Sequence, residues 1–129
     1  MPSKAKIMVV EDNIDESKLI KMALEPEGYE VVTAMNGKEA KEKMDSEKPN
    51  FIVLDVMMPE MDGFHFCSWV RSQPEYQKIP VVLLTGVAEH IYDTKYPLKG
   101  VMEADADEYL EKPVKPEVLL KTISKLIKK

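Results

Sequence analysis

Short apolar runs separated by polar segments recur along the chain and predict alternating strands and helices. Three of the runs are four residues long and rich in β-branched side chains, at residues 7–10, 51–54 and 81–84. Such runs are typical of strands that are buried on both faces of a sheet. Residues 29–34 alternate between apolar and polar positions and predict a more peripheral strand, and Tyr109-Leu110 predicts a short last strand.

The segments between these strands carry apolar residues at helical spacing. The faces expected to be buried are Leu19, Ile20, Ala23 and Leu24 in the first helix, Ala40 and Met44 in the second, Phe66, Cys67 and Val70 in the third, and Leu119, Leu120, Ile123, Leu126 and Ile127 in the last. The first helix should end at Pro26-Glu27-Gly28, and Pro116 suits the first position of the last helix. Trp69 lies beside the apolar face of its helix and should point at least partly outward.

Five alternations of strand and helix suit right-handed crossover connections. The predicted fold class is α/β, with one parallel sheet that carries helices on both faces. In open sheets of this kind, ligands bind beyond the carboxyl ends of the strands. Candidate chemistry is therefore sought at that edge.

Composition narrows the classes of protein that remain. The 129 residues match a single domain, which typically has about 100–200 residues, and we expect one domain over 1–129 with its core at about 5–128. The lone Cys67 excludes an internal disulfide, and no apolar run approaches the length of a membrane span. A net charge of −5 with a single arginine argues against nucleic-acid binding. We expect a soluble cytoplasmic domain without membrane or nucleic-acid partners.

Polar residues follow the predicted strands at the points where they end. Glu11 and Asp12 follow the first strand, Asp55 the third, Thr85 the fourth and Lys112 the last. Each alone could be an ordinary turn, cap or solvated loop residue. Because parallel strands point the same way, all five should lie along one edge of the sheet.

The five side chains together match the requirements of phosphoryl transfer. Crowded carboxylates repel one another, and an oxygen-only ligand set with room for water suits Mg²⁺. A carboxylate beside the metal can attack phosphorus and form an acyl phosphate. A lysine ammonium and a threonine hydroxyl can bind the remaining phosphoryl oxygens.

The chain resembles the receiver domain of two-component response regulators, the CheY-like family, over nearly its whole length. The matching segments are Val10-Glu11-Asp12-Asn13, Leu54-Asp55-Val56-Met57-Met58-Pro59-Glu60-Met61-Asp62-Gly63, Leu84-Thr85-Gly86 and Ala106-Asp107-Glu108-Tyr109-Leu110-Glu111-Lys112-Pro113. The resemblance implies a flavodoxin-like, doubly wound fold with five parallel strands in the order 2-1-3-4-5.

The resemblance also implies a role for each acidic residue. Asp55 is the expected phosphoacceptor, which receives its phosphoryl group from a sensor histidine kinase or a phosphotransfer protein. Glu11, Asp12 and Asp55 are the expected ligands of Mg²⁺, with the backbone carbonyl of Met57 as a further ligand. Such a protein is a signalling module that catalyses only its own phosphorylation and dephosphorylation.

The resemblance also implies which residues bind the phosphoryl oxygens and which change the surface that a downstream protein binds. Thr85 and Lys112 are expected to bind the phosphoryl oxygens, and the Lys112–Pro113 peptide bond is expected to be cis. Tyr109 occupies the switch-aromatic position and would turn inward when Thr85 moves, although an ordinary strand aromatic is an equal alternative. The output is expected to be binding of a downstream protein by a monomer or weak dimer, through the fourth helix, fifth strand and last helix.

Two features depart from the usual family pattern. Thr85 and Lys112 are 27 positions apart, more than in most relatives, and the excess falls at 90–101. Pro97 and Gly100 oppose a continuous helix there, so we expect a broken or shifted fourth helix or a loop. Met57 and Val87, at the positions that flank the hydrolytic water, are apolar, so autodephosphorylation should be slow.

Other functions fit the sequence less well. A haloacid-dehalogenase-like phosphatase needs an acid at the position of Met57, and no glycine-rich nucleotide-binding loop is present. A flavin phosphate would be repelled by the carboxylates. The alternative that remains is a degenerate receiver that binds partners independently of phosphorylation.

Overall fold

A computed structural model describes residues 5–55, 63–85, 106–111 and 114–127 of the chain. The predicted disruption of a fourth helix at 90–101 lies outside these residues. So do Met57, Val87 and the Lys112–Pro113 bond, as well as the side chain of Thr85.

A five-stranded parallel sheet forms the centre of the molecule. Its strands are β1 (Lys6–Val10), β2 (Glu30–Ala34), β3 (Phe51–Asp55), β4 (Val81–Thr85) and β5 (Glu108–Glu111). They lie in the order β2-β1-β3-β4-β5, and every pair is parallel. The predicted α/β class and the strand order 2-1-3-4-5 are confirmed.

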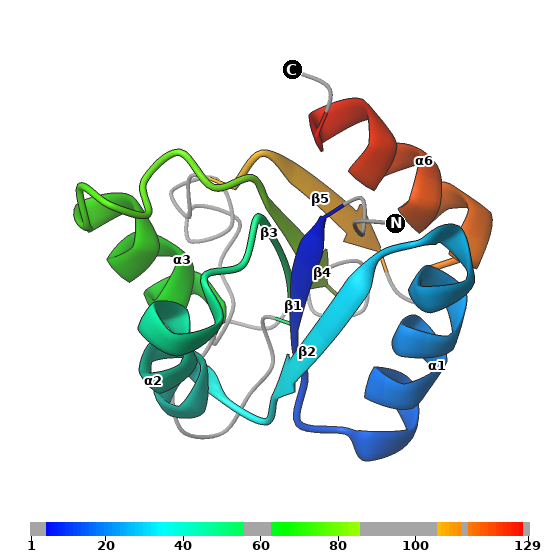
Figure 1. Ribbon diagram of the computed structural model, residues 1–129, viewed down its shortest axis with the longest axis horizontal. Coiled ribbons are helices and arrows are strands. Elements are labelled where there is room, and N and C mark those ends of the chain that lie inside the picture. The colour runs from blue at the N-terminus through cyan, green and yellow to red at the C-terminus, as the bar shows by residue number, and fades with distance from the viewer. Residues whose placement is uncertain (1–4, 56–62, 86–105, 112–113, 128–129) are drawn as a thin grey trace, which may run out of the picture.

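Helices cover both faces of the sheet. They are α1 (Ile14–Leu24), η1 (Glu25–Glu27), α2 (Gly37–Glu47), α3 (Gly63–Ser72) and α6 (Pro116–Ile127). Figure 1 shows α1 and α6 on one face and α2 and α3 on the other. None of the helices that the structure describes is long and apolar enough to cross a membrane.

Alternation along the central strands divides the core into two clusters. In β1, Met8 and Val10 pack in the cluster beneath α2 and α3, while Ile7 and Val9 pack in the cluster beneath α1 and α6. All four are fully buried. This arrangement explains the continuous apolar runs, because a strand with helices on both faces has no solvent-facing side.

The predicted helix faces agree with the structure except at one position. The buried or partly buried positions include Ala40 and Met44 of α2, Phe66, Cys67 and Val70 of α3, and Leu119, Leu120, Ile123, Leu126 and Ile127 of α6. The prediction for Leu19 is wrong, because its side chain is 66% exposed. The buried stripe of α1 runs through Ser17, Ile20 and Leu24, and Leu19 is displaced from Ile20 by about 100° around the helix axis.

Local signals account for several element boundaries. Asn13 and Asn36 cap α1 and α2, where their side chains accept hydrogen bonds from the backbone N–H groups of Glu16 and Glu39. Gly28 ends η1 with a φ of 96°, a left-handed conformation that glycine adopts without a Cβ clash. The first helix was predicted to end at Pro26-Glu27-Gly28; α1 ends at Leu24, and the helical turn η1 that continues it ends at Glu27, before Gly28.

Candidate functional site

Glu11, Asp12 and Asp55 meet where two central strands end. Glu11 and Asp12 directly follow β1, and Asp55 is the last residue of β3, which pairs with β1. The backbone N–H of Glu11 donates to the carbonyl of Ala34 at 2.9 Å, so hydrogen bonding to β2 continues past the end of β1. The three acidic residues thus lie at the carboxyl edge of the sheet, as the sequence predicts.

These carboxylates form a compact cluster. One oxygen from each of the three side chains lies within 4.8 Å of the other two. Glu11 and Asp55 are each only 3% exposed, whereas Asp12 is more open to solvent. Negative charges held this close and largely removed from water repel one another strongly, so a bound cation would stabilise the arrangement.

The donor set fits Mg²⁺ better than a transition metal. All three donors are carboxylate oxygens, which Mg²⁺ prefers, and the exposure of Asp12 leaves room for the water ligands that Mg²⁺ retains. Among the described residues, no cysteine or histidine joins the cluster. Glu11, Asp12 and Asp55 therefore form the acidic pocket in which a divalent cation would be held.

The start of α1 restrains the backbone beside this pocket. The Asn13 side chain accepts from the N–H of Glu16 at 3.0 Å, and the Asn13 carbonyl accepts from the N–H of Ser17 at 2.9 Å. These bonds begin the helix immediately after the acidic pair. The turn that carries Glu11 and Asp12 is consequently tied to regular structure on both sides.

Of the two residues predicted to bind the phosphoryl oxygens, the structure describes only the backbone of Thr85. Thr85 ends β4 and is paired in register with Glu111, the last residue of β5. Lys112 is the next residue in the chain after Glu111 and lies outside the described residues. The strands that lead to Thr85 and Lys112 thus end at the same edge as β3, where Leu84 is the partner of Asp55.

Tyr109 is partly buried in the middle of β5. Its side chain packs against the cluster beneath α2 and α3, whereas the neighbouring Leu110 packs against the cluster beneath α1 and α6. Its packing fits both predictions for Tyr109, namely a side chain that turns inward when Thr85 moves and an aromatic residue that only packs in the strand.

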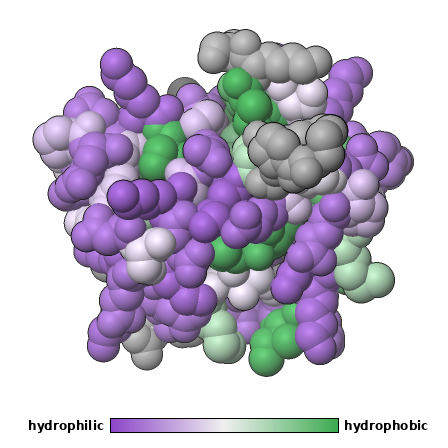
Figure 2. Space-filling view, viewed as in Figure 1, coloured by the Kyte–Doolittle hydropathy of each residue, from purple (hydrophilic) through white to green (hydrophobic). Residues whose placement is uncertain are grey.

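An apolar surface beside the acidic pocket was not foreseen from the sequence. Ile14 of α1 is 57% exposed, Met35 is 45% exposed, and together with Glu11 and Lys18 they line a shallow cavity of about 280 Å³. Figure 2 shows a mostly hydrophilic face whose lower edge, below the start of α1 and the end of β2, carries hydrophobic atoms. The sequence did carry an indication of this surface: α1 has more apolar residues than a single buried stripe can hold, so some of them must be exposed.

A doubly wound parallel sheet with an acidic cluster at its carboxyl edge defines a class of α/β domains that bind their ligands beyond the ends of the strands. Comparison with known families narrows this class. Residues 7–124 match the response regulator receiver domain family. The chain belongs to this family, and it is accordingly a signalling module of two-component systems.

Individual relatives agree with this assignment. The signal receiver domain of a signal transduction histidine kinase from Syntrophus aciditrophicus has 35% sequence identity and a TM-score of 0.88, over 96% of this chain and 90% of that one. The chemotaxis response regulator CheY4 of Vibrio cholerae has 34% identity and a TM-score of 0.82, over 95% and 98%. A probable transcriptional regulator, ycf27 of Cyanophora paradoxa, is 38% identical over 98% of this chain and 50% of its own length. The chain spans about half the length of the first curated relatives that it matches.

Proposed function

We propose that residues 1–129 act as one phosphorylatable receiver domain, in which Asp55 accepts a phosphoryl group from a phosphohistidine. The observation that carries this proposal is the cluster of Glu11, Asp12 and Asp55 oxygens within 4.8 Å, with Asp55 at the end of the central strand β3. A lone strand-end aspartate has many structural uses. Three converging carboxylates, two of them buried, favour a site that binds a cation.

The proposed reaction is a direct transfer between two side chains. One carboxylate oxygen of Asp55 attacks the phosphorus, a P–O bond forms, and the P–N bond breaks with its electron pair remaining on the imidazole nitrogen of the donor. Glu11, Asp12 and Asp55 would hold Mg²⁺, which supplies positive charge to the phosphoryl oxygens when it is bound. The backbone carbonyl of Met57 is the proposed further ligand.

Thr85 and Lys112 complete the proposed site. The Lys112 ammonium would neutralise one phosphoryl oxygen, and the Thr85 hydroxyl would donate a hydrogen bond to another. Movement of Thr85 toward the phosphoryl group would vacate space for Tyr109 to turn inward. The surface of β5 and α6 would then change, and with it the affinity for a downstream protein.

The donor must also dock close to Asp55. The outer face of α1 exposes Ile14, Leu19 and Met22, at 57%, 66% and 68%, and α1 begins two residues after Asp12. Lys18 lies on the same outer face and is exposed. Asp15 is exposed on this face as well. We therefore assign donor binding to this surface on the strength of its exposed apolar residues, which would suit the apolar face of an amphipathic helix.

Phosphorylation by a small-molecule donor tests the proposal without a kinase. The protein is incubated with Mg²⁺ and phosphoramidate and analysed by intact mass, with Asp55→Asn as the test variant and Asp15→Asn as the control. The expected result is one added phosphoryl group in the wild type and in Asp15→Asn, and none in Asp55→Asn. Absence of the adduct in the wild type with phosphoramidate, and with a histidine kinase as donor, would instead support a receiver that binds partners independently of phosphorylation.

A further inference from the structure

Asp107 holds the first residues of β4 and β5 together. Its backbone N–H donates to the carbonyl of Val81 at 2.9 Å, and its carboxylate Oδ2 accepts from the N–H of Val81 at 2.8 Å. A single residue at the amino end of β5 thus pairs with both backbone groups of the first residue of β4. This double contact defines which residue of β5 lies opposite which residue of β4.

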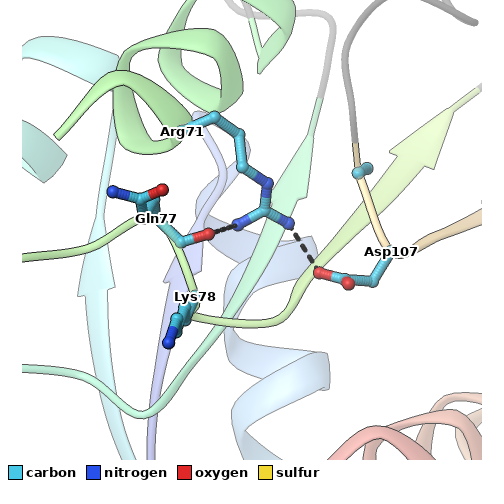
Figure 3. Close-up of a pocket in the computed structure, with 5 residues that line it drawn as sticks. Arg71, Gln77, Lys78 and Asp107 are labelled. Atoms are coloured by element: carbon cyan, nitrogen blue, oxygen red, sulfur yellow. Dashed lines mark hydrogen bonds and ion pairs between the residues drawn. The ribbon is translucent and has the colours of Figure 1, made fainter. Parts of the chain in front are cut away.

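Arg71 holds the Asp107 carboxylate in that position. Its Nη2 atom lies 2.6 Å from Asp107 Oδ2, and its Nη1 atom donates to the carbonyls of Gln77 at 3.0 Å and Ile79 at 2.7 Å. Figure 3 shows Arg71 extending from α3 to Gln77 and Asp107, while Lys78 points away from the pair. The Arg71 side chain is only 16% exposed. The Asp107 side chain is 39% exposed. The contact is charge-assisted, and the two carbonyls hold the guanidinium in place, so it costs less side-chain entropy than an ion pair between two free surface side chains.

The side chains of β5 itself do little to fix its register on β4. The strand has four residues, none of which is fully buried, and it pairs only with β4 at the edge of the sheet. Tyr109 packs on one face and Leu110 on the other, so a shift by one residue would still place an apolar side chain on each face. Hydrophobic alternation, which normally prevents such a slip, therefore does not prevent it here.

The register of β5 affects the opposite end of the strand. In the observed register Glu111 pairs with Thr85, and Lys112 follows Glu111 in the chain. A slip by one residue would displace the carboxyl end of β5 by about 3.3 Å along the strand. Displacements smaller than this impair reactions that depend on precise orientation.

We infer that Arg71 and Asp107 are positioning residues for phosphorylation of Asp55, which act by fixing the register of β5 on β4. This inference rests on the proposed function. The pair lies at the amino edge of the sheet, on the far side from Glu11, Asp12 and Asp55, and contacts neither β1 nor β3 through any of the hydrogen bonds described above. It should therefore influence the reaction through β4 and β5 and leave the cation ligands unchanged.

The experiment compares Arg71→Ala, Arg71→Lys and Asp107→Ala with the wild type and with Lys78→Ala. Lys78 is a matched control, because it is an exposed cation that lines the same cavity of about 360 Å³. Three quantities are measured at a temperature at which circular dichroism shows every variant folded. They are the rate of Asp55 phosphorylation by phosphoramidate, the Mg²⁺ affinity by calorimetry, and the β4–β5 register from backbone nuclear Overhauser effects.

Arg71→Ala and Asp107→Ala should reduce the phosphorylation rate by about tenfold or more, leave the Mg²⁺ affinity within about twofold, and weaken the cross-strand signals between Val81 and Asp107. Lysine at position 71 should not restore the rate, since one ammonium cannot bind two carbonyls and a carboxylate in a planar fork. Lys78→Ala should behave as the wild type.

Two results would overturn the inference. One is a wild-type rate in Arg71→Ala, and the other is a parallel loss of rate and Mg²⁺ affinity, which would indicate a general disturbance of the fold. If the wild type is not phosphorylated by any donor, the proposed function fails instead. The register signals would then still show whether the pair fixes β5.

Discussion

The phenolic hydroxyl of Tyr76 donates a hydrogen bond to the Asp45 carboxylate and so joins the segment after α3 to α2. The ring centroid of Trp69, on α3, lies 5.8 Å from those of both Phe66 and Tyr76. The ammonium of Lys41, on α2, lies 5.0 Å from the centroid of the Trp69 ring. These contacts explain why Trp69 is only partly exposed and why α2, with few apolar residues, stays in place.

The Tyr76–Asp45 contact should make stability depend on alkaline pH. The hydrogen bond to Asp45, with some burial and the nearby negative charge, raises the pKa of Tyr76 from 10.0 to about 12. The folded state therefore holds its proton at pH values at which the unfolded chain has lost it. The resulting stabilisation is fully present below pH 10 and is lost as the pH rises through about 12.

Urea unfolding of the wild type and of Tyr76→Phe checks this dependence. The free-energy difference between the two proteins should shrink as the pH is raised from 9 toward 12. Absorbance titration of Asp45→Asn should show the pKa of Tyr76 moving back toward 10.0. An unchanged tyrosine titration in Asp45→Asn would contradict the assigned cause.

Removal of one carboxylate from the acidic pocket should have opposite effects with and without Mg²⁺. Asp12→Asn should raise the unfolding temperature of the metal-free protein, because it relieves repulsion of Glu11 and Asp55. The same substitution should weaken Mg²⁺ binding by at least about tenfold, since ligand charge sets the affinity of such sites. Thermal unfolding across a Mg²⁺ titration measures both effects, with Asp15→Asn as the control. Equal Mg²⁺ stabilisation of Asp12→Asn and the wild type would exclude Asp12 as a ligand.

The exposed face of α1 should matter for a protein donor but not for a small one. Ile14→Ala and Met22→Ala should each lower kcat/KM for transfer from a histidine kinase. The expected loss is about tenfold per substitution, which is typical of a residue at the centre of an interface. Their rates with phosphoramidate should equal that of the wild type. Val118→Ala is a suitable control, because Val118 is 42% exposed on α6. A loss of rate with both donors would place these residues in the phosphorylation site itself.

Dephosphorylation should be slow in the isolated protein with Mg²⁺. The side chains of Met57 and Val87 can neither orient a water molecule nor accept its proton, so attack on the acyl phosphate is poorly assisted. Loss of the phosphoryl group can be followed by intact mass after removal of phosphoramidate. Met57→Asn should shorten the half-life. A half-life of only seconds in the wild type would contradict the prediction.

Strands and their order in the chain were predictable because they depend on local pattern. The runs at 7–10, 51–54 and 81–84 are apolar on both faces, and only strands between two helical layers need that composition. The acidic pocket followed from the same reasoning, since residues that end parallel strands meet at one edge.

Two kinds of feature were not predictable in this way: which apolar residues of a helix are buried, and which side chains of distant elements contact one another. Leu19 fits an apolar helix face as well as Ile20 does, and only the packing of α1 against the sheet exposes it. Arg71 is the single arginine of the chain, and its neighbours in the sequence give no indication of its partner. Its contact with Asp107 joins residues 36 positions apart, for which the local sequence carries no signal.

The sequence by itself determined the class of fold, the direction of the strands and the residues that gather at their carboxyl ends, because hydrophobic periodicity and parallel connection leave few alternatives. Tertiary structure alone decided three further features. They are the separation and burial of the carboxylates, the exposed apolar surface on α1, and the Arg71–Asp107 pair at the amino ends of β4 and β5. Each depends on how elements distant in the chain pack together, and such contacts are set by geometry in space rather than by spacing along the sequence.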